Sequence, residues 1–80
     1  MDIKQLVATV ASVATNADLN TIYALVMLAA EELKLKLDVS ITLVEEALRQ
    51  LVEEGYLIEY EEATLDLSKR TRKYIATEKL

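Results

Sequence analysis

Cysteine, histidine and proline are absent from this 80-residue chain, and glycine occurs once, at Gly55. Without cysteine and histidine the chain cannot form disulfide bonds, thiolate or imidazole metal sites, cysteine nucleophiles or a Ser-His-Asp arrangement. One glycine is also too few for a phosphate-cradling glycine loop. We therefore expect a protein that is not an enzyme, that holds no metal or cofactor, and that has no evident small-molecule site.

Aromatic residues are scarce as well, with four Tyr and no Phe or Trp, although 52% of the residues are apolar. The core must therefore be built from aliphatic side chains. The length predicts a single domain over residues 1–80. The longest apolar run, Ile22 to Ala30, has nine residues, whereas a membrane span needs about 20. Asp2 and Lys4 interrupt any signal-peptide pattern, so we expect a cytoplasmic protein.

The formal net charge of −5 is unevenly distributed along the chain. Residues 1–37 carry −1, residues 38–67 carry −8 with Arg49 as their only cation, and residues 68–80 carry +4. An acidic middle followed by a basic end affects the choice of binding partner rather than the fold.

Hydrophobic spacing predicts three helices, over residues 3–14, 20–36 and 42–54. Asp18 or Asn20 is expected to cap the second helix, and Ser40 the third. The second helix is apolar on nearly all sides, which indicates either a central position in the core or a contact between subunits. Its end is ambiguous, because Leu33 to Val39 could be helix or strand. Gly55 is placed to end the third helix in the left-handed conformation.

After Gly55 the hydrophobic period changes from 3.6 to 2, which predicts two short strands. The first covers about residues 56–60, the turn lies near Glu61 to Ala63, and the second strand covers residues 64–68. Residues 69–79 are predicted to return to helix. The expected fold class is therefore mainly α with a small β-hairpin (α+β): three helices, a two-stranded wing and a C-terminal helix.

The recognition half of this pattern resembles winged helix-turn-helix regulators of the GntR type. The resemblance is carried by Leu37 to Leu51 and by Glu53 to Ile58, while Leu65 to Arg72 is similar to the wing exit of MarR- and PadR-type regulators. It implies a small DNA-binding transcriptional regulator that acts as a homodimer. The chain departs from the family pattern at Ile41 and Glu45, where the family usually carries arginine facing DNA.

The first functional hypothesis is therefore binding to double-stranded DNA. Arg49, and Lys34 or Lys36, would contact phosphates together with the basic end of the chain, and the candidate DNA-binding residues are Thr42, Arg49, Gln50, Lys69, Arg70, Arg72 and Lys73. Of these, Thr42, Arg49 and Gln50 could reach bases.

The alternative hypothesis is a winged-helix module that binds a basic protein partner and not DNA. It depends on the acidic third helix and wing, and its candidate residues are Glu45, Glu46, Glu61 and Glu62. These carboxylates repel phosphate, whereas basic side chains supply most non-specific DNA affinity. A membrane partner is not expected under either hypothesis.

Overall fold

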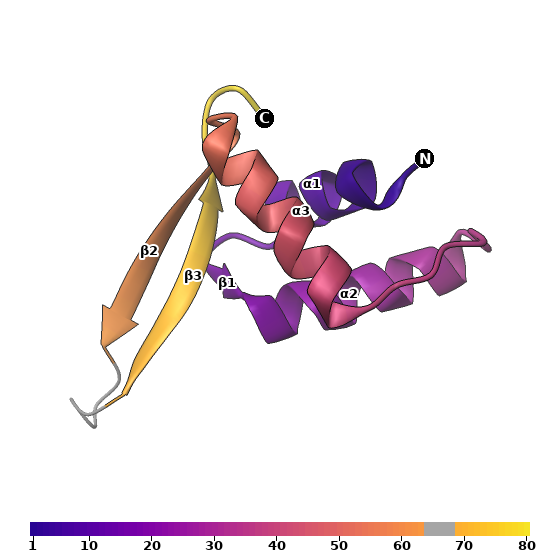
Figure 1. The fold of residues 1–80 in the computed structure, drawn as a ribbon, viewed down its shortest axis with the longest axis horizontal. Coiled ribbons are helices and arrows are strands. Elements are labelled where there is room, and N and C mark those ends of the chain that lie inside the picture. Colours follow the sequence, from indigo (N-terminus) through magenta and orange to yellow (C-terminus); the bar gives the residue numbers. More distant parts are fainter. Residues whose placement is uncertain (64–68) are drawn as a thin grey trace.

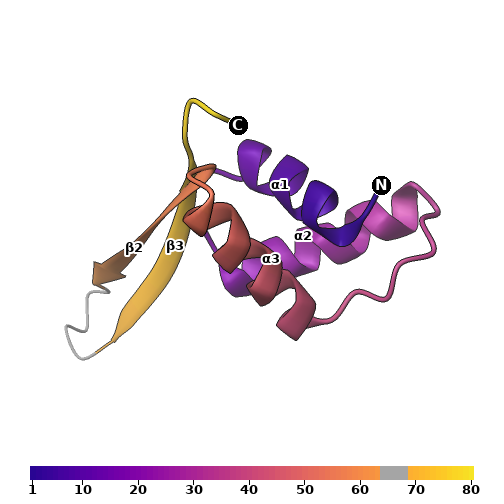
Figure 2. The same cartoon turned by 45° about the horizontal axis from the view of Figure 1, so that its top comes forward.

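The computed structural model describes residues 1–63 and 69–80, and it places three helices beside a three-stranded antiparallel sheet (Figure 1). In chain order the elements are α1 (Ile3–Val13), β1 (Ala17–Asp18), α2 (Leu19–Glu32), α3 (Ile41–Glu53), β2 (Leu57–Ala63) and β3 (Arg70–Ala76). The helices form one group, and the β2–β3 hairpin extends away from them (Figure 2).

Each helix begins at a side chain that accepts a hydrogen bond from the first turn. Asp2 caps α1 and forms a capping box with Gln5. Asp18 accepts from the Thr21 backbone N–H at 2.8 Å, and Ser40 accepts from the Leu43 backbone N–H at 3.2 Å. Of the two caps expected as alternatives for the second helix, Asp18 is the one observed, and the predicted cap at Ser40 is confirmed. These oxygens satisfy N–H groups that have no partner within the helix.

Removal of the Asp18 cap should destabilise the protein in a pH-dependent way. The hydrogen bonds from Thr21 hold the pKa of Asp18 below its ordinary value. Asp18→Ala should therefore lower the free energy of unfolding by about 1 kcal/mol at neutral pH. Because the folded-state pKa is lowered, the difference from wild type should be complete above the ordinary carboxyl pKa of about 4 and should disappear as the pH falls through the folded value. Urea unfolding at several pH values measures it.

Asn20→Ala is the matched control for this prediction, because Asn20 is an exposed residue in the same first turn. It should change the unfolding free energy little at any pH. An Asp18→Ala variant as stable as wild type at neutral pH would contradict the assignment of Asp18 as the cap.

Helices α2 and α3 end in the same way, with one residue in the left-handed conformation. Gly55 has φ 83°, and the Tyr56 N–H donates back to the Leu51 carbonyl at 2.9 Å. Lys34 has φ 53°, and the Leu35 N–H donates to the Ala30 carbonyl at 2.9 Å. Both ends are Schellman motifs. The prediction for Gly55 is confirmed, whereas α2 ends at Glu32 and the following segment to Ser40 is neither helix nor strand.

The sheet has the order β1-β3-β2, and both pairings are antiparallel. Ala17 pairs with Tyr74 at one edge, and Leu57 pairs with Ala76 at the start of the hairpin. The short strand β1 was not predicted, so the sheet has three strands instead of two. The predicted turn near Glu61 to Ala63 is also wrong, because β2 continues through Ala63. The second predicted strand, residues 64–68, lies outside the described residues.

The predicted C-terminal helix over residues 69–79 is wrong, because residues 70–76 form strand β3. The local sequence contains the reason. Thr71, Tyr74 and Ile75 are β-branched or aromatic and suit a pleated surface. A helix beginning near Lys69 would also place cations at its positive end, whereas the strand places them opposite acidic residues of β2.

The core is aliphatic, as expected, and is centred where the helices meet the sheet. Its members come from every element, and the fully buried large side chains are Leu6, Val7, Ile22, Val26, Val44, Leu48 and Leu57. Tyr74 is the one buried aromatic residue among those described. On α3 the predicted stripe of Val44, Leu48 and Leu51 is buried, and Val52 is partly buried. The core therefore fixes α3 against the base of the hairpin.

Candidate functional site

The register of the hairpin places its charged residues on two faces. Leu57 and every second residue after it on β2 lie on one face of the hairpin. Tyr74 and every second residue on β3 lie on the same face, which packs on the helices near the hairpin base. Further along the hairpin this same face carries Glu59 and Glu61 from β2. It also carries Arg70 and Arg72 from β3. This face of the hairpin is therefore buried against the core at its base and is exposed and charged further out. The opposite face carries Glu62 and Lys73.

Ion pairs join the two strands on both faces. Arg72 Nε lies 2.9 Å from Glu59 Oε1, and Arg70 Nη1 lies 3.5 Å from Glu61 Oε2. On the opposite face Lys73 Nζ lies 2.7 Å from Glu62 Oε2, which raises the pKa of Lys73. Exposed pairs of this kind contribute only about 0–1 kcal/mol each. The carboxylates therefore balance these cations without holding them firmly.

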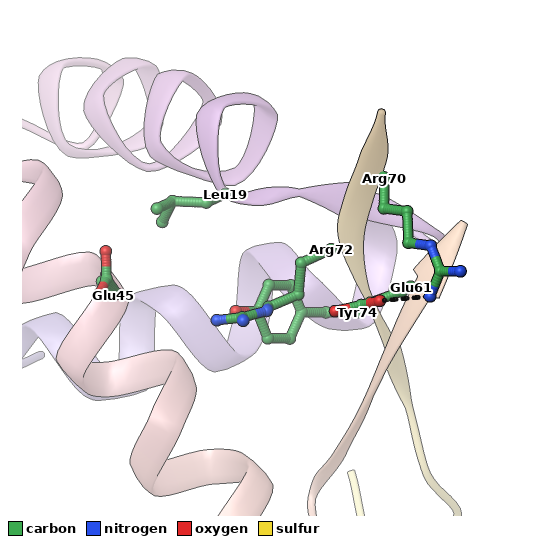
Figure 3. A pocket seen from close by; sticks show the side chains of 6 residues that line it. All are labelled: Leu19, Glu45, Glu61, Arg70, Arg72 and Tyr74. Carbon is green, nitrogen blue, oxygen red and sulfur yellow. Dashed lines mark hydrogen bonds and ion pairs between the residues drawn. The ribbon is translucent and has the colours of Figure 1, made fainter. Parts of the chain in front are cut away.

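A cleft of about 250 Å³ lies between the hairpin and the helices (Figure 3). Four elements supply its lining, which consists of Leu19, Glu45, Glu61, Arg70, Arg72 and Tyr74. Arg70 and Arg72 come from alternate positions of β3: Arg72 extends beside the Tyr74 ring toward α3, where Glu45 lies, and Arg70 extends in the other direction, to Glu61 (Figure 3). Each guanidinium group can bind a phosphate with two parallel hydrogen bonds.

Tyr74 forms the floor of this cleft and is 4% exposed. Burial raises the pKa of its phenol, and the negative charge of Glu59 raises it further. The positive charge of Arg72 acts in the opposite direction. The phenol is therefore protonated at neutral pH and offers the cleft a hydroxyl without a charge.

The outer face of α3 is acidic. Its exposed residues include Thr42, Glu45, Glu46, Arg49 and Glu53. Arg49 Nη2 lies 2.7 Å from Glu46 Oε1, and Arg49 Nη1 lies 3.4 Å from Glu53 Oε1. The only cation of α3 is therefore shared by two carboxylates of its own helix. This arrangement leaves α3 with a single basic group, whose charge is balanced by carboxylates of the same helix.

The structure brings together only some of the predicted site residues. Arg70 and Arg72 from the DNA-binding set share the cleft with Glu45 and Glu61 from the partner-binding set. Thr42 and Arg49 are exposed on α3, Gln50 is partly buried, and Lys69 is exposed before β3. Lys73 and Glu62 lie on the other hairpin face, and Glu46 pairs with Arg49. Neither predicted set forms one continuous surface.

Three residues that belong to this site were not predicted from the sequence: Leu19, Glu59 and Tyr74. In a strand over residues 70–76, Tyr74 lies on the same face as Arg70 and Arg72, because these residues are spaced by two. That spacing is the signal in the sequence that could have identified Tyr74 as a site residue. Leu19 enters the cleft only through packing between helix and sheet. No sequence pattern indicates that contact.

Residues 1–63 and 69–80 contain no cluster of three or more acidic side chains that could hold a metal ion. In the same part of the chain no helix is both long and apolar enough to cross a membrane. Comparison with protein-family models, with curated proteins and with solved structures finds no match to this chain.

Proposed function

We propose that this chain is a winged helix-turn-helix domain that binds double-stranded DNA as a transcriptional regulator. The element order supports this: a helix, a short strand, two helices and a hairpin, with strand order β1-β3-β2. In this proposal α3 occupies the place of the recognition helix and β2–β3 forms the wing. The short edge strand β1 completes the sheet beside β3.

The wing, and not α3, carries the DNA contact in this proposal. The observation that supports it most directly is the position of Arg70 and Arg72 in the cleft between the hairpin and α3. Lys69, just before β3, adds a further cation, whereas Lys73 lies on the opposite face of the hairpin. Because the ion pairs to Glu59 and Glu61 are exposed, phosphate oxygens can replace those carboxylates at small cost. Glu45 and Glu46 keep α3 itself away from phosphates.

Binding of a fluorescent duplex as a function of salt concentration tests the proposal. Each phosphate neutralised by a lysine or arginine contributes about −0.9 to the slope of log affinity against log salt. Two or three contacts from the wing predict a slope of roughly −2 to −3. Absence of binding to any duplex at low salt, or an affinity independent of salt, would overturn the proposal.

A basic protein partner is the second candidate function, and one observation favours it. Glu45, Glu46 and Glu53 give α3 a negative exposed face whose single cation, Arg49, is already paired with two of them. The proposed partner-binding set is less coherent, because Glu62 lies on the opposite hairpin face from Glu61.

One variant distinguishes the two functions. Glu45→Lys with Glu46→Lys should strengthen duplex binding if DNA is the ligand, because it removes two charges that repel phosphate. The same variant should abolish binding of a basic peptide if α3 is a docking face for protein. Polylysine is a sufficient probe for the second outcome.

A further inference from the structure

The inner part of the cleft between the hairpin and the helices contains two opposite charges that are not paired with each other. Arg72 extends beside the Tyr74 ring toward α3, and Glu45 lies on α3 (Figure 3). The ion pair of Arg72 is with Glu59 and uses Nε. Within the part of the chain that the structure describes, no ion pair joins Arg72 to Glu45. A positive and a negative group therefore line the same cleft from two elements.

Both charged groups lie near the hydroxyl of Tyr74. Burial has the largest effect on the pKa of this phenol and raises it; the negative charges of Glu59 and Glu45 raise it further, and the positive charge of Arg72 lowers it. The Tyr74 ring forms the floor of the cleft, and Leu19, the first residue of α2, adds an apolar side chain to its lining. Sites for small molecules combine apolar lining of this kind with a few polar groups that fix the orientation of the ligand.

The size and the charge of the cleft together restrict the ligand. The volume of about 250 Å³ lies below the range of about 300–1,000 Å³ that is usual for drug-sized ligands, so the ligand must be small. The lining contains two acidic residues, Glu45 and Glu61, and two basic ones, Arg70 and Arg72. A small molecule with one charge of each sign can meet an opposite charge at both Arg72 and Glu45, whereas an ion of either sign alone leaves one of these two groups without a partner.

We propose that this cleft binds a free α-amino acid in its zwitterionic form. Arg72 holds the carboxylate, because its planar guanidinium group offers two parallel N–H donors that match the two carboxylate oxygens. Glu45 accepts hydrogen bonds from the ammonium group, which has three N–H donors. An aliphatic side chain of the ligand lies against the Tyr74 ring and Leu19. A quaternary ammonium group cannot replace the primary one, because it has no N–H to donate to Glu45.

This ligand site goes beyond the proposed DNA binding, and no small-molecule site was expected from the sequence. If the chain binds DNA through the wing, the amino acid and a DNA phosphate compete for Arg72, so the ligand weakens duplex binding. That consequence rests on the proposed function, but the ligand site does not. Titration with the ligand in the absence of nucleic acid tests the site alone, and the salt dependence of duplex binding tests DNA binding alone.

Titration of the ¹⁵N-labelled protein with L-leucine, at constant pH and ionic strength, tests the proposal. The backbone amides of Leu19, Glu45, Arg72 and Tyr74 should shift and saturate in the millimolar range, because the two charged groups are exposed and such contacts are weak. Leucinamide lacks the carboxylate and N-acetylleucine lacks the ammonium, so each should bind about fivefold more weakly or worse. Absence of a saturable shift with leucine, or equal affinity for leucine and either analogue, would overturn the proposal.

Substitutions of single charges complete the test. Arg72→Gln and Glu45→Gln should each weaken leucine binding by about fivefold or more, because each removes one of the two charges that the ligand meets. Arg70→Gln is the matched control on β3, because Arg70 extends away from α3, and Glu46→Gln is the control on α3, because Glu46 does not line the cleft. Both controls should bind leucine as the wild type does. All four positions are exposed, so the variants should fold, and the same spectra check this. Equal losses in the controls and in the two test variants would contradict the site.

Discussion

Leu48→Ala should lower the free energy of unfolding by roughly 2–5 kcal/mol. Leu48 is fully buried on α3 and belongs to the cluster that joins this helix to α1, α2 and the hairpin base. The alanine variant loses the transfer free energy of the side chain and leaves a cavity in its place. Domains of this length are stabilised by about 4–12 kcal/mol in total, so the loss is a large fraction of that value. Urea denaturation measures it directly.

Leu43→Ala is the matched control on the same helix, because Leu43 is 43% exposed. Its effect should be below about 1 kcal/mol, as for most surface substitutions. Equal effects of the two substitutions would contradict the orientation of α3. The melting temperature of Leu48→Ala should also fall by about 10 °C or more, since 1 kcal/mol corresponds to roughly 4–8 °C in domains of this size.

Reversal of two wing charges should have the largest effect on DNA binding. Arg70→Glu with Arg72→Glu removes both cations from the cleft and places carboxylates beside Glu45 and Glu61. Duplex affinity at low salt should fall by about tenfold or more, and the salt slope should become shallower by about 2, because two phosphate contacts are lost. Fluorescence anisotropy over a salt series measures both quantities. Unfolding measurements check that the variant still folds.

The control for this variant changes the net charge by the same amount at another place. Lys34→Glu with Lys36→Glu alters two exposed lysines in the segment between α2 and α3, and neither lines the cleft. Its affinity should fall much less, and its salt slope should stay close to the wild-type value. An equal loss in both double variants would show that binding responds to net charge and not to the wing.

The helices could be predicted from the sequence because their signals are local. The spacing of Val44, Leu48 and Leu51 identified the buried stripe of α3, and Ser40 and Gly55 marked its two ends. The same local logic failed at the end of α2. Lys34 adopts the left-handed conformation there, and lysine, unlike glycine, gives no sign of it.

Strand β3 could not be predicted, because the interactions that form it are distant in the sequence. Residues 69–73 are mostly good helix formers when considered alone. Their position in the sheet depends on pairing with β2 and β1, which lie earlier in the chain. Strand β1 has two residues, too few to show any alternation.

Only part of the candidate site was predicted from the sequence. Arg70 and Arg72 belonged to the predicted DNA-binding set, and Glu45 and Glu61 belonged to the predicted partner-binding set, but the other members of both sets lie outside the cleft. The hairpin register places Glu61, Arg70 and Arg72 on one face, and the packing of α3 brings Glu45 to the same cleft. The register could not be obtained from the sequence, because the expected turn lacked an Asn-Gly or similar signal that fixes it.

A ¹H–¹⁵N correlation spectrum recorded during titration with a short duplex shows whether the proposed β2–β3 wing carries the DNA contact. We expect the largest shifts at the backbone amides of Arg70 to Lys73 and at the Arg70 and Arg72 side chains, with small shifts along the outer face of α3. Shifts concentrated at Thr42, Glu45 and Arg49, with the hairpin unchanged, would contradict it.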